Sequence, residues 1–403
     1  MKRNLQTIIL VTALMLVAIS AFVFYTITYG NGFPLNKEGI DILGRQVIDK
    51  CKDAPYRPTC YEQEIPNLVG KISMEDAFRV TKIVQELDPT YAYCHVLAHK
   101  ISFAEAERKQ NDWRDIMTRC PFTMCNYGCL HGSLIERFRG EVLDEKQKEE
   151  AVNELQDVCE PRGSWNPTSL DKNMCYHALG HLAVYITGAD IKEANDFCKK
   201  VSVKEGIRDY YEICVEGVYM TIYQGIDPEE IALVAEIKPE KSEVRQYCSQ
   251  FEGVDYEACN RESYPLFLED LKKPESLAEF CSYTTDEHGL WKCYATAISD
   301  ITVDLLERNS LEQVPEYCLG LSGKFKSQCF ANVAVRMVQI EPDYVDKAVA
   351  ICEQATNNQI GEECFRDLSI FASTAFFKGS SELEDFCGRF PDQWKNKCLQ
   401  GNY

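Results

Sequence analysis

The sequence has little positive charge for its content of acidic residues. Its 43 Lys and Arg residues stand against 63 Asp and Glu residues, which gives a formal net charge of -20. A protein that binds the nucleic-acid backbone needs a basic surface, so this balance argues against a nucleic-acid partner. The chain also lacks a Gly-rich phosphate loop, a Gly-x-Ser-x-Gly elbow and a His-Glu-x-x-His motif. These absences leave no support for the common nucleotide-binding, serine-hydrolase or metalloprotease patterns.

Long apolar runs are scarce, with one exception near the N-terminus. Residues 8–29 contain no charged side chain, and about 20 apolar residues are enough for a helix to cross a bilayer. Lys2 and Arg3 precede this run, which by the positive-inside rule places the N-terminus in the cytoplasm. We therefore predict a single-pass anchor in the cell membrane. A signal peptide cleaved after small residues such as Ala18 and Ser20 is the alternative.

This anchor sets the predicted domain organisation. It consists of a cytoplasmic N-terminus over residues 1–7, a transmembrane helix over 8–29, a linker over 30–37 and an extracytoplasmic domain over 38–403. The 20 cysteines agree with that location, because an even number of cysteines outside the cytosol is typical of disulfides. No Asn-x-Ser/Thr glycosylation site occurs, which favours a bacterial or archaeal exterior over a eukaryotic lumen.

The cysteines recur in a repeating pattern over residues 150–403. Each unit has a first Cys, a mostly polar connector and a second Cys that opens an apolar helical run. The two cysteines lie 11 to 16 positions apart, and the second cysteines recur every 34 to 45 positions. A period of about 35 residues corresponds to one helical hairpin per repeat. We therefore predict an all-α, disulfide-stapled solenoid of antiparallel helix pairs after the N-terminal transmembrane helix.

A disulfide across each connector would staple consecutive repeats together. Each bridge would contribute about 3 kcal/mol in the chain-entropy view of disulfides. The predicted pairs are Cys51 with Cys60, Cys159 with Cys175, Cys198 with Cys214, Cys248 with Cys259, Cys281 with Cys293, Cys318 with Cys329, Cys352 with Cys364 and Cys387 with Cys398. Repeat logic suggests Cys94 with Cys125 and Cys120 with Cys129. Other pairings among these last four stay open.

The repeat architecture resembles the tetratricopeptide and Sel1-like superfamily of helical-hairpin solenoids. The resemblance covers the period and the helix pairing over roughly residues 150–403. The tetratricopeptide consensus of Trp, Leu-Gly, Tyr and Pro at fixed places does not map onto these repeats. The resemblance implies a concave surface that binds a protein partner.

Five of the six histidines lie between residues 94 and 182, each close behind a cysteine that opens a helix. Four of them form two His-x-x-x-His pairs, a spacing that places both imidazoles on one face of a helix. The fifth is His131. One slot, two residues after the helix-opening cysteine, holds His131, His177 and Glu216 in turn. The candidate metal ligands in this His-rich part, residues 94–216, are His95, His99, His131, His177, His181 and Glu216.

Neighbouring repeats would bring these side chains together. Equivalent positions of a solenoid line one surface, and the small residues Gly132, Ala178, Gly180 and Gly217 beside the ligands would permit close helix approach. With the cysteines in disulfides, imidazole and carboxylate remain as ligands, a set that suits zinc, copper or iron. We predict a metal site in this cluster. The alternative is a set of buried histidines with a structural role only.

Two functions from different classes fit these features. The first is a membrane-anchored extracytoplasmic protein that binds a partner on its repeat surface and holds a metal ion in the histidine cluster. The second is a metal-dependent enzyme, hydrolytic or oxidative, in which the His/Glu cluster leaves a coordination position open to activate water or oxygen. We favour the first, because solenoids more often bind than catalyse.

Overall fold

The computed structural model describes residues 35–109, 112–121, 124–138, 143–163, 165–206, 208–225 and 228–401. The first helices are α2 (Lys37–Cys51), α3 (Arg57–Glu64), α4 (Met74–Leu87), α5 (His95–Arg108), α6 (Trp113–Arg119), α7 (Gly128–Glu136), α8 (Glu145–Leu155), α9 (Ser169–Ile186), α10 (Ile191–Val201) and α11 (Tyr210–Tyr223). Strands β1 (Lys204–Glu205) and β2 (Arg208–Asp209) form a short antiparallel hairpin before α11.

The remaining helices complete the array. They are α12 (Pro228–Val234), α13 (Val244–Cys248), α14 (Gly253–Glu262), α15 (Leu268–Leu271), α16 (Ser276–Phe280), α17 (Glu287–Glu307), α18 (Val314–Gly320), α19 (Phe325–Ile340), α20 (Val345–Asn357), α21 (Gly361–Ala375), α22 (Ser381–Gly388) and α23 (Asp392–Gln400). Short 3-10 helices lie between them, among them η2 (Cys125–Tyr127) and η7 (Pro342–Tyr344).

Side chains just before the helices set where several of them begin. Asp144 and Thr168 each accept a hydrogen bond from the backbone N–H three residues on, and the residue there bonds back, which forms a capping box. Asp190 caps α10 and Ser73 caps α4 through single hydrogen bonds. Each such cap stabilises its helix by about 1 kcal/mol.

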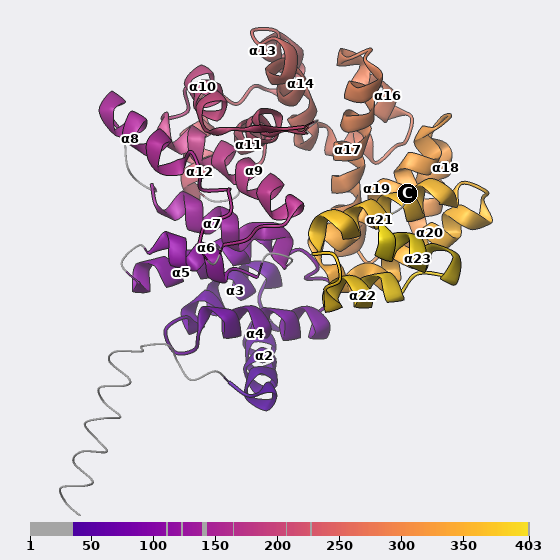
Figure 1. Ribbon diagram of the computed structural model, residues 1–403, viewed down its shortest axis with the longest axis horizontal. Helices are drawn as coiled ribbons and strands as arrows, with labels where there is room; N and C mark the ends of the chain where they lie inside the picture. The colour runs from indigo at the N-terminus through magenta and orange to yellow at the C-terminus, as the bar shows by residue number, and fades with distance from the viewer. Residues whose placement is uncertain are drawn as a thin grey trace, which may run out of the picture.

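Helices opened by the second cysteine of each repeat form an inner layer. In chain order they include α7, α9, α11, α14, α17, α19, α21 and α23, and each of these packs against the next. Figure 1 shows α8, α10, α13 and α16 on the outside of this layer. A continuous buried core runs along the layer from Ala92 to Cys398, and a smaller apolar cluster joins the N-terminal helices.

Ten disulfides link these helices, and none of the 20 cysteines is free. The bonds join Cys51–Cys60, Cys94–Cys125, Cys120–Cys129, Cys159–Cys175, Cys198–Cys214, Cys248–Cys259, Cys281–Cys293, Cys318–Cys329, Cys352–Cys364 and Cys387–Cys398. These are the pairs that the spacing suggests. Among the four cysteines whose pairing the sequence leaves open, the structure selects the repeat-based alternative.

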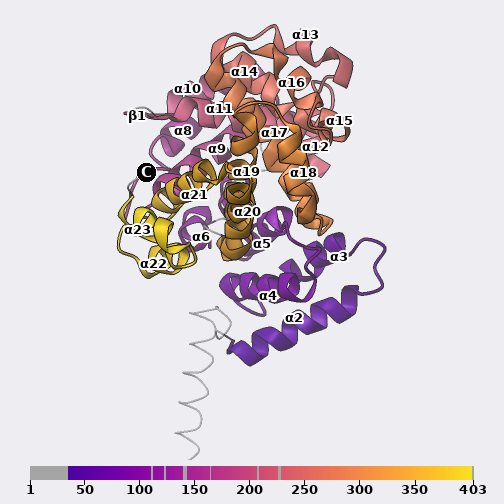
Figure 2. The same ribbon diagram turned by 90° about the vertical axis from the view of Figure 1, so that its right-hand side faces the viewer.

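The array curls so far that its late repeats contact its early ones, unlike an open solenoid. Lys82 of α4 forms an ion pair with Asp343 of η7. Arg336 of α19 donates a hydrogen bond of 3.1 Å to Asn126 Oδ1 and lies 6.0 Å from the Tyr93 ring centroid. Helix α21 also contacts α9, and Figure 2 shows α21 beside the early helices. These contacts join parts of the chain that lie far apart in sequence.

The predicted fold class is wrong in including a transmembrane helix. Within the described ranges, no helix combines the length and the apolar character that crossing a bilayer requires. The two described helices of 18 residues or more, α9 and α17, carry charged side chains such as Lys172 and Asp300. The predicted span itself, residues 8–29, lies outside the described residues. The described chain is therefore a disulfide-rich helical array without an assigned membrane span.

Candidate metal centre

Five imidazoles from three helices gather around His131. His95 and His99 come from α5, His131 from α7, and His177 and His181 from α9. The ring centroid of His131 lies 5.0 and 5.9 Å from those of the α5 pair, and 5.6 and 5.5 Å from those of the α9 pair. His131 therefore stands between the two His-x-x-x-His pairs.

Glycines allow the helices to approach closely enough for this convergence. A Cβ atom on Gly132 would lie 2.2 Å from Ser102 Oγ, and one on Gly180 would lie 1.9 Å from the carbonyl oxygen of Cys214. A Cβ atom on Gly217 would lie 2.1 Å from the carbonyl oxygen of His177. Only glycine leaves room for contacts this short. Three of the small residues that the sequence indicates are therefore required at the helix crossings.

The first three histidines form a compact group. One ring nitrogen from each of His95, His99 and His131 lies within 4.8 Å of the others. The side chains are only 2 to 3% exposed. The Nε2 atoms of His95 and His99 are 3.1 Å apart, and a tetrahedral ion with bonds of about 2.0 Å holds two nitrogens about 3.3 Å apart. This buried group could hold a metal ion.

Hydrogen bonds orient His95 toward the interior of the group. Its Nδ1 lies 3.2 Å from the carbonyl oxygen of Cys125 and 3.0 Å from that of Asn126. Because carbonyl oxygens only accept, Nδ1 carries the hydrogen and Nε2 presents a lone pair to the cluster, as in metal-ligating histidines. Nδ1 of His99 and both ring nitrogens of His131 have no hydrogen-bond partner among the described residues. Such buried polar atoms are rare without a bound species.

The carbonyls that face His95 come from a strained turn. All three residues of η2 have left-handed φ angles, of 53, 48 and 63°, and none is a glycine. Each costs about 1 to 2 kcal/mol. The Cys94–Cys125 disulfide and the hydrogen bond from Arg336 to Asn126 hold the turn in place. Strain of this kind gathers at functional sites, where the surrounding structure maintains it.

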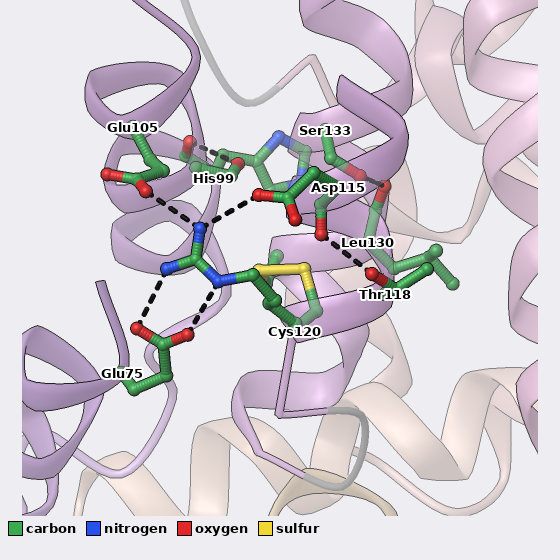
Figure 3. The surroundings of a disulfide bond; sticks show 11 residues. Glu75, His99, Glu105, Asp115, Thr118, Cys120, Leu130 and Ser133 are labelled. Atoms are coloured by element: carbon green, nitrogen blue, oxygen red, sulfur yellow. Dashed lines mark hydrogen bonds and ion pairs between the residues drawn. A yellow bond between two sulfur atoms is a disulfide. The ribbon is translucent and has the colours of Figure 1, made fainter. Parts of the chain in front are cut away.

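A network beside the Cys120–Cys129 disulfide fixes α6 near His99, as Figure 3 shows. At its centre is the guanidinium of Arg119. Its carboxylate partners are Glu75 of α4, Glu105 of α5 and Asp115 of α6, at 2.7, 2.9 and 3.1 Å. Because the next residue, Cys120, is bonded to α7, the ion pairs and the disulfide together clamp four helices around the first three histidines.

The α9 pair is oriented in a similar way. His181 Nδ1 lies 2.8 Å from Thr221 Oγ1, and that hydroxyl donates its own hydrogen to the Gly217 carbonyl oxygen at 3.0 Å. The hydroxyl therefore accepts from His181, whose Nε2 is left with a lone pair. This Nε2 lies 3.2 Å from His177 Nε2.

Glu216, the predicted carboxylate ligand, is engaged elsewhere. Its Oε1 lies 2.6 Å from Nη2 of Arg261, which is 2% exposed and also contacts Glu262 Oε1 at 3.2 Å. Arg261 occupies the same slot as Glu216, two residues after the helix-opening Cys259. This continuation of the slot places a cation beside the carboxylate, so an ion pair and not metal ligation is the better interpretation of Glu216.

Burial favours the neutral form of His95, His99, His131 and His177. It lowers the pKa of His95 to about 4, with the neighbouring His181 adding to the effect. Burial and nearby imidazoles also hold the pKa values of His99, His131 and His177 well below the usual value. Neutral imidazoles can bind a metal ion at neutral pH without first releasing a proton.

A surface pocket approaches the site from the side of His95. Its volume is about 510 Å³, and Tyr91, Tyr93, Val96 and Glu307 are among its lining residues. The Tyr93 ring stacks on His95 with centroids 5.7 Å apart. Tyr93 therefore lines this pocket and also contacts His95.

No family model, curated protein or solved structure matches the chain. Function therefore has to be inferred from the chemistry of the site. That chemistry is a buried His95, His99 and His131 group, able to hold a metal ion, within a disulfide-rich helical array.

Proposed function

We propose that this protein binds a transition-metal ion through His95, His99 and His131. One observation carries the proposal: three buried imidazoles converge with their nitrogens within 4.8 Å. Zinc, copper and iron all accept imidazole ligands. The unpartnered nitrogens of His99 and His131 support the proposal, because a bound ion would satisfy them.

Binding is a better role for this site than catalysis. The three side chains are almost fully enclosed, whereas a catalytic ion keeps a coordination position that substrate can reach. The ten disulfides favour an oxidising compartment as the place of action. A protein partner on the repeat surface stays a prediction.

A metal-dependent hydrolytic or oxidative enzyme is the second candidate. Three histidine ligands leave a fourth position of a tetrahedral ion for water or oxygen. The pocket beside Tyr93 favours this function, because Tyr93 lines the pocket and its ring also stacks on His95. An exogenous ligand separates the two functions: azide added to the cobalt-substituted protein changes the visible spectrum only if a position is exchangeable.

Elemental analysis of the full chain, produced with its disulfides formed, tests the proposal. We expect the His95, His99 and His131 group, here called the first site, to retain about one equivalent of metal. This is measured after incubation with zinc, copper or iron and removal of loosely bound ions. His99→Ala and His131→Ala should each lose that equivalent. His288→Ala is the matched control, because His288 stacks on Trp291 outside the cluster. A wild-type chain that retains no metal, or variants that retain all of it, would contradict the proposal.

A further inference from the structure

A second group of metal-binding atoms lies on the far side of His131. His177 Nε2 is 3.2 Å from His181 Nε2 and 3.3 Å from the Sδ atom of Met220. These atoms come from α9 and α11, which cross at Gly180 and Gly217 with no room for a side chain. The crossing therefore holds two imidazoles and a thioether in one small space.

The hydrogens of both imidazoles are used outside this space. His181 donates its Nδ1 hydrogen to Thr221, so its Nε2 presents a lone pair. The backbone of Ile213 beside the His177 ring acts on the pKa of His177 as a hydrogen-bond acceptor would. We assign this contact to Nδ1, because Nε2 of His177 faces His181 and Met220. Both Nε2 atoms then present lone pairs, as does the thioether sulfur.

In the tautomer with both hydrogens on Nδ1, the two Nε2 atoms and the sulfur face one another with lone pairs, and a cation would remove their mutual repulsion. The observed distances agree with a bound ion. A tetrahedral centre with bonds of about 2.0 Å to nitrogen and about 2.3 Å to sulfur separates two nitrogens by about 3.3 Å and a nitrogen from the sulfur by about 3.5 Å. The measured separations of 3.2 and 3.3 Å are close to these values.

We propose that His177, His181 and Met220 bind a second metal ion, monovalent copper. A thioether is a soft ligand that selects copper(I) over zinc, while imidazole accepts either. Every cysteine is held in a disulfide, so methionine supplies the soft sulfur here. The inference goes beyond the proposed function, since it needs no ion at the first three histidines.

The surroundings of the second group suit a site that exchanges its ion. His177 and Met220 are partly exposed, whereas His181 and His131 are buried. This edge of the group is therefore the one nearest to solvent. The buried carboxylate of Glu230 lies 3.8 Å from His181 Nδ1, where its charge offsets that of a bound cation.

A competition titration of the full, disulfide-bonded chain under nitrogen tests this site. Copper(I) is added as its acetonitrile complex against bicinchoninate, and X-ray absorption records the ligands. We expect tight uptake with a sulfur neighbour about 2.3 Å from copper. Met220→Leu should bind copper(I) at least roughly tenfold more weakly and lose the sulfur signal. Met74→Leu, which changes a buried methionine at the start of α4, should match the wild type.

Further variants separate this site from the first one. His99→Ala should lose the ion of the first site and keep copper(I) binding, because the His99 ring contacts the rings of His95, Phe103 and His131 and belongs to the first group, not to the α9 pair. Met220→His keeps a ligand at the position and should restore uptake, now with zinc as well as copper. If Met220→Leu binds copper(I) as the wild type does, and the wild type shows no sulfur neighbour, the second site is disproved. Loss of copper(I) in His99→Ala would equally overturn it.

Discussion

The Nε2 atoms of His95 and His99, one turn apart on α5, lie 3.1 Å from each other. The carbonyls of the strained η2 turn fix the first ring, and α7 brings His131 against both. The geometry of this group therefore depends on the η2 turn and on the glycines at the helix crossings. Each of these features can be changed separately.

Gly132→Ala should destabilise the protein and weaken metal binding together. The added Cβ atom would meet Ser102 Oγ at 2.2 Å and the Cα atom of His99 at 2.8 Å, so α7 must move away from α5. Overpacking of this kind costs about 1 to 3 kcal/mol of unfolding free energy. Urea unfolding and metal titration measure the two effects. Gly388→Ala is the control, because nothing lies within 4 Å of its Cβ position. A Gly132 variant as stable as this control would contradict the close packing of α7 against α5 at this glycine.

Removing the Cys94–Cys125 disulfide should weaken metal binding. The double variant Cys94→Ala/Cys125→Ala frees the η2 turn, whose strained residues then relax and take their carbonyls away from His95. We also expect a loss of about 2 to 5 kcal/mol in unfolding free energy.

The matched control for this bond is Cys387→Ala/Cys398→Ala, which opens a disulfide at the end of the array. It should lower stability yet leave the metal affinity unchanged. Equal metal affinities in the two double variants would show that the turn does not orient His95.

The metal-free protein should lose stability as the pH falls from about 6.5 to about 4. Burial lowers the pKa of His95 to about 4, so in this range the unfolded chain binds a proton that the folded chain does not. His95 alone then contributes about 3 kcal/mol of stability, which is complete above the unfolded pKa and is lost as the pH approaches the folded one. The lowered pKa values of His99, His131 and His177 add to this loss. Unfolding by urea at pH 7, 5.5 and 4 measures the slope. His95→Asn should make the slope shallower by its own share, and an unchanged slope would show that this histidine does not contribute.

Glu262 should produce the opposite pH dependence. Burial raises its pKa to about 8, against the opposing effect of Arg261. The folded chain then holds a proton that the unfolded chain has lost, so the unfolding free energy falls as the pH rises from about 4.5 to about 8. Glu262→Gln should remove much of that fall. A variant with the wild-type slope over this range would show that another group binds the proton.

Local patterns were the part of the structure that the sequence could predict. Each connector disulfide spans a short loop, as in Cys248–Cys259, so the spacing alone favours the observed pair. The approach of His131 to the two His-x-x-x-His pairs follows from repeats in phase and from a crossing glycine such as Gly132. Such features depend on neighbouring repeats only.

Contacts between distant repeats could not be predicted in this way. The Lys82–Asp343 ion pair exists because small rotations between repeats add up until the array closes, and no single repeat encodes that sum. The ion pair of Glu216 could be predicted only from the following repeat, where Arg261 occupies the same slot. The sequence did not indicate Met220 as a ligand, because a lone methionine in a helix is far more often a packing residue.

Anomalous X-ray scattering from crystals of the metal-loaded full chain, collected on both sides of the absorption edge, tests the central claim most directly. The account predicts a peak about 2.0 to 2.1 Å from Nε2 of His95, from Nε2 of His99 and from one ring nitrogen of His131. A loaded crystal with no peak among these three rings, or with its only peak at the surface, would contradict it.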